Sequence, residues 1–316
     1  MLGATPAGLA AALALSFLAA VGTYHAIEQP FRRNLLLTRS AALACGCGIA
    51  LVAVGALAGV GMRRWGLDQV YAGQGQWLSR SAVWADSPGI YNDGCLLWNT
   101  TVQKPCVYGN VKGPTVVLFG DSHAGNWFTP LQHAAVEAGW RLVVRVKASC
   151  PPVEGFGSTE CTEWRERTLR ELEANPPDVA ILAGKGNHSP EAERAILVRL
   201  GRVGRVFAVR DTPRWPKPTL DCLAAAKQPE DCRWPLASRI DAKSYPALRE
   251  IGLPLNTTVL DFNDRVCPGG TCDLLAGGWP IMFDTNHMTA TFCKRFAADF
   301  ERLLTAGDTI ATGSTR

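Results

Sequence analysis

Two long apolar stretches occupy the amino-terminal part of the chain. Residues 41–62 contain no charged side chain, and residues 5–24 are about as long and also uncharged. A helix of roughly 20 apolar residues crosses a bilayer core about 30 Å thick. The first stretch lacks the basic segment that precedes the apolar core of a signal peptide. The pattern therefore predicts two transmembrane helices within residues 1–62.

From residue 113 onward, short apolar runs alternate with amphipathic segments. The runs predict strands at 115–119, 141–146, 178–183, 205–209 and 257–260. The segments between and after them predict helices at 126–138, 163–174, 190–200, 239–250 and 289–305. Strands that alternate with helices are typical of a parallel sheet covered on both faces. We therefore expect one α/β domain at 113–306, a partly irregular linker at 63–112 and a frayed tail at 307–316.

Charges near the apolar stretches bear on orientation. Arg32, Arg33 and Arg39 lie between the two predicted membrane helices, so the positive-inside rule places that loop in the cytoplasm and both outer ends outside it. Arg63 and Arg64 follow the second helix and favour the opposite orientation. The net charge of +4 is modest, and no stripe of basic and aromatic residues suggests nucleic acid as a partner.

Cysteine spacing supports the orientation in which both outer ends of the predicted membrane helices lie outside the cytoplasm. Eight of the 11 cysteines form local pairs, each closing a short loop: Cys95 with Cys106, Cys150 with Cys161, Cys222 with Cys232, and Cys267 with Cys272. Such pairs suit disulfides in an oxidising compartment. A zinc site would require Cys-x-x-Cys spacing or interleaved histidines, and we expect no metal. Cys293, in the last predicted helix, is expected to be a buried thiol.

The most informative candidate for chemistry is Ser122. It follows the strand 115–119 after the turn Gly120–Asp121 and precedes a helix. This order places its hydroxyl at the carboxyl edge of a parallel sheet, where the N–H groups of the helix start can stabilise an oxyanion. In the simpler alternative, the segment is a turn in which Asp121 caps the helix.

A base for that serine is found near the end of the chain. His287 precedes Thr289, a candidate helix N-cap, and can reach Ser122 across the strand ends. Asp284 can orient the imidazole and stabilise its protonated form. Asn187, after the third strand, can offer its amide to the oxyanion, or it is simply a turn residue.

The segment Gly120-Asp121-Ser122-His123 and the later Asp284-x-x-His287 resemble the SGNH hydrolase superfamily over about residues 113–306. The resemblance implies a flavodoxin-like, three-layer domain with Ser122, His287 and Asp284 as catalytic residues and no cofactor. Asn187 is a loose counterpart of the family's oxyanion asparagine, and the family's oxyanion glycine has no clear counterpart.

Residues 24–33, which read Tyr-His-Ala-Ile-Glu-Gln-Pro-Phe-Arg-Arg, resemble the end of the membrane domain in acyltransferase family 3. Residues 149–152, Ser-Cys-Pro-Pro, resemble the subclass fused to a periplasmic SGNH domain. The resemblance implies O-acylation, usually O-acetylation, of a cell-surface polysaccharide such as lipopolysaccharide. It places the protein in the bacterial inner membrane, with its carboxyl-terminal domain in the periplasm. Since the earlier helices of that family are missing, we expect a late start, a truncated gene or one half of a split pair with a separate membrane subunit.

Three functions stay open at this point. The first is an acyltransferase that passes an acyl group from a donor to a glycan acceptor through a serine acyl-enzyme. The second is a carbohydrate esterase or deacetylase, in which water resolves the same intermediate. The third is a non-catalytic fragment that binds a glycan or a membrane partner.

Overall fold

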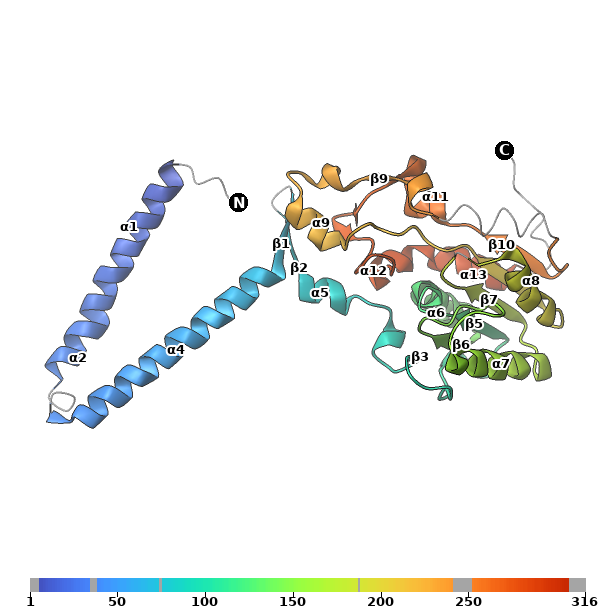
Figure 1. Cartoon of the computed structure of the whole chain (residues 1–316), viewed down its shortest axis with the longest axis horizontal. Helices are drawn as coiled ribbons and strands as arrows, with labels where there is room; N and C mark the ends of the chain where they lie inside the picture. The colour runs from blue at the N-terminus through green and yellow to red at the C-terminus, as the bar shows by residue number, and fades with distance from the viewer. Residues whose placement is uncertain (1–5, 35–38, 74–75, 187, 241–251, 307–316) are drawn as a thin grey trace. The chain divides into compact units, whose positions relative to one another are not determined.

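The computed structural model describes residues 6–34, 39–73, 76–186, 188–240 and 252–306 (Figure 1). The chain divides into two compact units, Met1–Leu67 and Asp68–Arg316. The boundary lies at the end of a long helix rather than at residue 62, where the apolar pattern ends. The predicted tail at 307–316 and most of the predicted helix 239–250 lie outside the described residues.

The first unit is helical throughout most of its described residues. It contains α1 (Pro6–Thr23), a π-helical turn (Tyr24–Glu28), α2 (Gln29–Arg33) and α4 (Ala41–Asp68). By length and composition, α4 is the one described helix that could cross a membrane. It contains the second of the two apolar stretches. The membrane-spanning role of α1 stays a prediction.

The second unit is built on a seven-stranded sheet with the strand order β10-β8-β7-β5-β6-β3, and β4 also pairs with β6. The strands are β3 (Leu96–Leu97), β4 (Val107–Gly109), β5 (Thr115–Gly120), β6 (Arg141–Lys147), β7 (Val179–Ala183), β8 (Arg205–Val209) and β10 (Thr257–Leu260). All pairs are parallel except β4 with β6. The five predicted strands match to within one residue at each end. Because β6 and β7 lie on opposite sides of β5, the strand order reverses at β5, where open α/β sheets commonly bind ligands.

Helices cover both faces of this sheet, as the alternation predicts (Figure 1). Val116 and Leu118 of β5 pack into one apolar core with α6 and α13, whereas Val117 and Phe119 pack into a second core with α7 and α8. The main helices are α6 (Phe128–Glu137), α7 (Thr159–Ala174), α8 (Pro190–Arg199), α9 (Thr219–Ala225), α11 (Asn263–Val266), α12 (Ala290–Cys293) and α13 (Ala297–Thr305). The predicted helix 289–305 is interrupted by a 3-10 turn between α12 and α13.

The segment predicted as an irregular linker is more ordered than expected. It contributes β3 and β4 to the main sheet, and a hairpin and helix precede them: β1 (Gln69–Gly73), β2 (Gln76–Ser79) and α5 (Arg80–Ala85). Strands of two or three residues are too short to show a period in the sequence, and Leu96 and Leu97 are both buried. Two further short pairings join β9 (Trp234–Pro235) with β11 (Thr271–Cys272), and β12 (Leu275–Ala276) with β13 (Trp279–Pro280).

The four disulfides join the four predicted pairs. The Cys95–Cys106 bond connects the segments of β3 and β4, which both pair with β6. Cys293 is a free thiol with no exposed surface, as expected for the core side of the last helical segment.

Candidate active site

The turn that carries Ser122 is shaped by close backbone approach and by a buried carboxylate. A Cβ added at Gly120 would lie 1.7 Å from the carbonyl oxygen of Ala183 in the neighbouring strand, so only glycine fits there. The Asp121 carboxylate accepts hydrogen bonds from the backbone N–H of His123 at 2.8 Å and of Lys185 at 3.0 Å. The turn after β5 is thereby tied to the loop after β7, and half-buried Ser122 lies at the carboxyl edge of the sheet.

The loop that carries His287 is a closed hairpin. Met282 and Met288 form a β-bridge, and the Phe283 N–H donates to the His287 carbonyl at 3.0 Å. Thr289 then caps α12, its hydroxyl accepting from the Phe292 N–H at 3.3 Å, as predicted. Backbone bonds on both sides therefore restrict where His287 can point.

Folding brings Ser122, His287 and Asp284 into one hydrogen-bonded row. The Nε2 atom of His287 lies 2.9 Å from the Ser122 Oγ, and its Nδ1 lies 2.6 Å from the Asp284 Oδ2. With Nδ1 donating to the carboxylate, Nε2 is free to accept the serine proton. These are the contacts that proton removal from a serine nucleophile requires.

Asp284 is held in its ionised form. Its second oxygen accepts from the backbone N–H groups of Asn286 at 2.8 Å and of His287 at 2.7 Å. Burial by itself would raise the pKa of the Asp284 carboxyl, but the hydrogen bonds from the His287 ring and from these backbone groups outweigh it and lower the pKa. An ionised Asp284 can stabilise the imidazolium that forms when Ser122 loses its proton.

Aromatic rings confine the His287 imidazole. The Phe283 ring stacks on it with ring centres 5.8 Å apart, and Tyr91 meets it edge-on at 6.2 Å. The Tyr91 hydroxyl is buried without a hydrogen-bond partner among the described residues. Burial, followed by the charge of Asp284, raises the Tyr91 pKa, so this phenol stays neutral.

A second histidine–carboxylate pair lies directly behind the first. The Nδ1 atom of His123 lies 2.5 Å from the Asp211 carboxylate, and its Nε2 lies 2.5 Å from the side-chain amide of Asn286. The sequence reasoning missed Asp211 and Asn286. The available signals were the position of Asp211 just after a predicted strand and that of Asn286 inside the Asp-x-x-His segment.

Another asparagine near the site, Asn126, uses its side chain in hydrogen bonds within the protein. Its side-chain oxygen accepts from the Met288 N–H at 2.9 Å, and its amide donates towards Thr212 Oγ1 at 3.3 Å and the Asn286 carbonyl at 3.4 Å. Asn126 thus fastens the His287 loop. Asn187 lies outside the described residues, and its oxyanion role stays a prediction.

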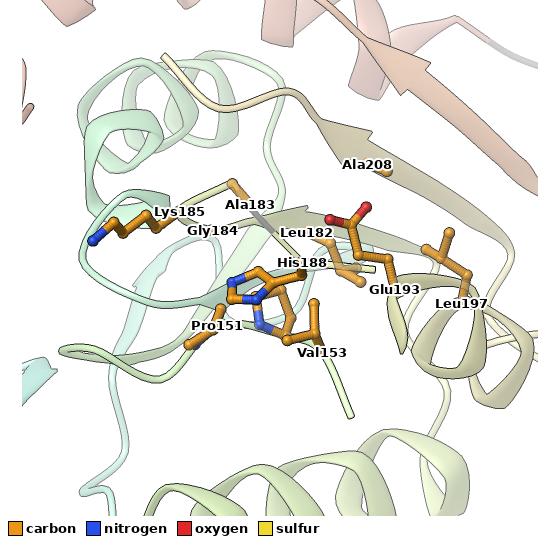
Figure 2. Close-up of a pocket in the computed structure, with 11 residues that line it drawn as sticks. Pro151, Val153, Leu182, Ala183, Gly184, Lys185, His188, Glu193, Leu197 and Ala208 are labelled. Carbon is orange, nitrogen blue, oxygen red and sulfur yellow. The ribbon is translucent and has the colours of Figure 1, made fainter. Parts of the chain in front are cut away.

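Beyond the triad, a small apolar pocket lies at the carboxyl ends of β7 and β8 (Figure 2). Figure 2 shows Glu193 and Leu197 extending from α8 towards Leu182 and Ala208 of these strands. Burial raises the pKa of Glu193 to about 8. The His188 ring also lines this pocket, and burial lowers its pKa. Both groups are therefore neutral near pH 7.

Comparisons with known proteins agree with this fold. The family model described as an SGNH domain fused to AT3 domains matches residues 93–302. The solved structure of a lipopolysaccharide acetyltransferase periplasmic domain from Salmonella ser. Paratyphi A is similar, with a TM-score of 0.50 and 14% identity over 61% of this chain and 84% of that chain. At this identity, the likeness shows a shared fold. No curated protein matches the chain in sequence.

The matched region covers more than half of the chain and includes both residues of the Ser122–His287 contact. It does not extend to residues 24–33, so their resemblance to acyltransferase family 3 stays a prediction. The chain belongs to the family of SGNH domains that are fused to AT3 domains.

Proposed function

We propose that this protein is a membrane-anchored O-acyltransferase that modifies a cell-surface glycan through an acyl-enzyme on Ser122. The observation that carries the proposal is the 2.9 Å contact between the Ser122 Oγ and the His287 Nε2, with Asp284 on the other ring nitrogen. The similar Salmonella domain is that of a lipopolysaccharide acetyltransferase, which favours acetyl as the acyl group and lipopolysaccharide as the type of acceptor.

The reaction proceeds in two steps. His287 takes the proton of Ser122 while Oγ attacks the carbonyl carbon of the acyl donor, and the resulting imidazolium protonates the leaving group. In the second step, His287 takes the proton of a sugar hydroxyl, whose oxygen attacks the carbonyl carbon of the acyl-enzyme. The bond from that carbon to the Ser122 Oγ breaks, and the imidazolium returns the proton to Oγ, which restores the free serine. Asp284 keeps the imidazole oriented in both steps. The N–H of Ser122, with Asn187 as a second donor, stabilises the tetrahedral oxyanions.

Other parts of the chain support the anchor and the compartment. The apolar helix α4 has the length to hold the protein in the inner membrane, and four disulfides suit a catalytic unit in the periplasm. The acyl donor is then supplied to Ser122 through membrane helices of the AT3 type, in this protein or in a separate subunit.

Activity-based labelling tests the nucleophile. The full chain in detergent micelles is expected to react with a fluorophosphonate probe at Ser122 and to turn over p-nitrophenyl acetate. Ser122→Ala should abolish labelling and lower turnover by at least about 10⁴-fold. Ser238→Ala, at an exposed serine outside the site, is the matched control. A wild-type protein that fails to label would support the non-catalytic alternative.

The acceptor separates the two enzymatic alternatives. With p-nitrophenyl acetate as donor and an oligosaccharide present, a transferase forms acetylated sugar. An esterase releases only acetate, whether or not the sugar is present. Mass spectrometry of the sugar products distinguishes the two outcomes.

A further inference from the structure

We propose that a hollow beside the catalytic edge binds the acceptor of this reaction as a neutral pyranose. The inference rests on the proposed function and names the substrate class for it. The hollow, called here the Trp98 hollow, has a volume of about 490 Å³. It is lined by Trp98, Asn99, Lys147, Ser149, Ser158 and Glu160, among others. The volume lies within the range of about 300–1,000 Å³ that is usual for small-molecule sites.

The position of the Trp98 hollow relative to Ser122 follows from sheet register. Gly120 at the end of β5 pairs with Val146 of β6, and Leu97 at the end of β3 pairs with Lys147. Ser122 and Trp98 therefore both lie just past the carboxyl ends of their strands, on one edge of the sheet. Adjacent strands are about 4.8 Å apart, so the two-strand step from β5 to β3 measures roughly 10 Å. A glycan in the hollow can present a hydroxyl of the same or the next sugar residue to the nucleophile.

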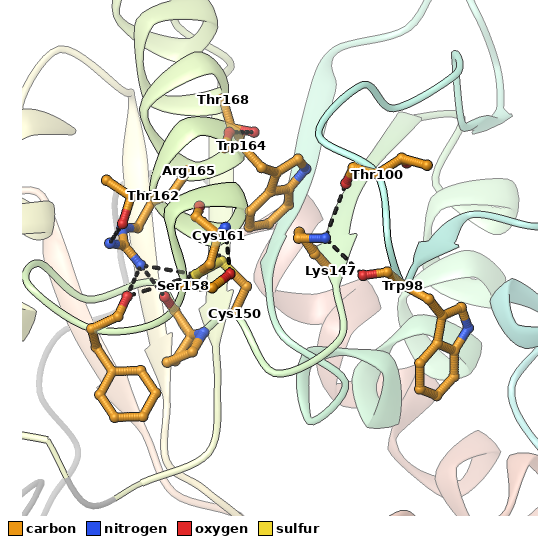
Figure 3. Close-up of a disulfide and its surroundings, with 12 residues drawn as sticks. Trp98, Thr100, Lys147, Cys150, Ser158, Cys161, Thr162, Trp164, Arg165 and Thr168 are labelled. Carbon is orange, nitrogen blue, oxygen red and sulfur yellow. Dashed lines mark hydrogen bonds between the residues drawn. A yellow bond between two sulfur atoms is a disulfide. The ribbon is translucent and has the colours of Figure 1, made fainter.

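Lys147 supplies a fixed hydrogen-bond donor. The residue is 3% exposed, and its ammonium donates to the carbonyl oxygens of Trp98 at 2.8 Å and Thr100 at 2.9 Å (Figure 3). These two bonds hold the backbone that presents Trp98 and Asn99. An ammonium has three N–H groups, so one N–H of Lys147 is left over for a ligand.

The loop on the other side of the Trp98 hollow is held by a disulfide and by hydrogen bonds. Ser149 has a φ of 56°, a left-handed conformation that costs a non-glycine residue energy and persists where the surroundings impose it. The Cys150–Cys161 disulfide joins this loop to α7 (Figure 3). Arg165 also donates to the Phe156 carbonyl at 2.8 Å. Residues in unfavourable backbone conformations are found most often at active sites and ligand-binding sites.

The mixture of charges selects the ligand class. Glu160 carries a carboxylate, whose pKa is lowered by a hydrogen bond from the Ser158 hydroxyl. A negatively charged ligand close to Lys147 would also meet this carboxylate, which favours a neutral partner. Sugar hydroxyls both donate and accept, so they can bond to Lys147 and Glu160 together. The Trp98 indole, 61% exposed, offers an apolar face to the C–H face of a pyranose ring.

Binding measurements test the site independently of turnover. Full-length Ser122→Ala protein in detergent micelles is titrated by NMR saturation transfer and calorimetry with methyl α-D-glucopyranoside, -galactopyranoside and -mannopyranoside, and with the charged methyl α-D-glucopyranosiduronate. We expect at least one neutral glycoside to bind more tightly than the uronate. Adding Trp98→Ala should weaken that binding by about tenfold. Trp77→Ala, at a similarly exposed tryptophan on β2, should leave it unchanged.

Three results would overturn the inference: no binding of any neutral glycoside, uronate binding at least as tight, or equal binding by the Trp98→Ala protein. Glu160→Gln provides a further check, because removing the carboxylate should improve uronate binding. Turnover separates this inference from the proposed function. If sugar acetylation is intact but unaffected by Trp98→Ala, the Trp98 hollow is not the acceptor site. If the glycosides bind through Trp98 but the wild-type protein does not label at Ser122, the proposed acyl-enzyme mechanism is wrong, whereas the Trp98 hollow is still a sugar-binding site.

Discussion

The imidazole of His123 lies nearly perpendicular to that of His287, with ring centres 5.2 Å apart. His287 contacts the nucleophile, whereas His123 is buried against Asp211 and holds the side chain of Asn286, the residue before His287. One histidine is thus placed to exchange protons with Ser122. The other positions the loop from which the first extends.

Replacing His123 with Gln should reduce turnover without changing substrate binding. The variant loses the paired contacts to Asp211 and Asn286, so the His287 loop can shift away from Ser122. We expect kcat for p-nitrophenyl acetate to fall by about 10–100-fold with KM within about twofold, since small displacements of a catalytic group have effects of this size. Steady-state kinetics on the full chain measure both constants. An unchanged kcat would contradict the positioning role.

The same variant should have a characteristic pH dependence of stability. Burial alone would lower the pKa of His123. The charge and the hydrogen bond of Asp211 raise it, and Asp121 adds a smaller increase. These effects outweigh burial and the opposing charge of Arg214, so the pKa of His123 is raised. Because the pKa of His123 is higher in the folded protein than in the unfolded chain, protonation stabilises the fold. This stabilisation is complete at pH values below the pKa in the unfolded chain, about 6.5, and is lost as the pH rises through the pKa in the folded protein. The difference in the free energy of unfolding between wild type and His123→Gln should therefore be larger at pH 5.5 than at pH 9. Thermal unfolding at both pH values measures it, and a difference that grows with pH would refute the assignment.

Asp284→Asn should impair catalysis much more than folding at neutral pH. An asparagine can hold the imidazole in the wrong tautomer and cannot stabilise its protonated form, which costs about 10⁴-fold in kcat in serine triads. Because the folded-state pKa of Asp284 is lowered, its contribution to stability is present above the unfolded value near 3.9 and is lost as pH falls through the folded value. Stability curves of wild type and variant should therefore converge towards acid. A variant with more than a tenth of wild-type kcat would argue against the triad.

Gly120→Ala should destabilise the catalytic unit. The added methyl group would lie 1.7 Å from the Ala183 carbonyl oxygen, so β5 and β7 would have to separate just before Ser122. Overpacking typically costs about 1–3 kcal/mol, and we expect a cost at the upper end of this range here. Gly139→Ala is the matched control for space, since no atom lies within 4 Å of a Cβ at that position, although its φ of 72° adds some strain. Melting temperatures should fall much further for position 120 than for position 139.

Removing the Cys95–Cys106 disulfide should loosen one edge of the sheet. The bond closes a short loop between β3 and β4, and chain entropy assigns about 3 kcal/mol to a loop of this length. The double variant Cys95→Ser/Cys106→Ser should therefore unfold at a lower temperature under oxidising conditions. Since Trp98 follows β3 directly, faster hydrogen exchange around residues 96–100 should accompany the loss. A melting temperature equal to that of wild type would show that β3 is held by packing alone.

Much of the architecture could be predicted from the sequence because its signals are local. The strand at 115–120 is a run of apolar residues bounded by turn residues, and the helix after Thr289 begins at a recognisable cap. The disulfides were predictable because each pair is only 5 to 11 residues apart, so few other pairings were plausible. β3 was missed because two residues carry no period, and its place in the sheet depends on pairing with distant β6.

Local pattern determined that this chain has an α/β unit, which residue could be a nucleophile and which histidine could serve it. Tertiary structure alone decided that residues 122 and 287, separated by 165 positions, stand 2.9 Å apart. It also decided that His123, adjacent to Ser122 in sequence, turns inward to Asp211. The physical reason is that strand order and loop packing set these distances. Both depend on how buried surfaces from the whole unit fit together, which no short stretch of residues specifies.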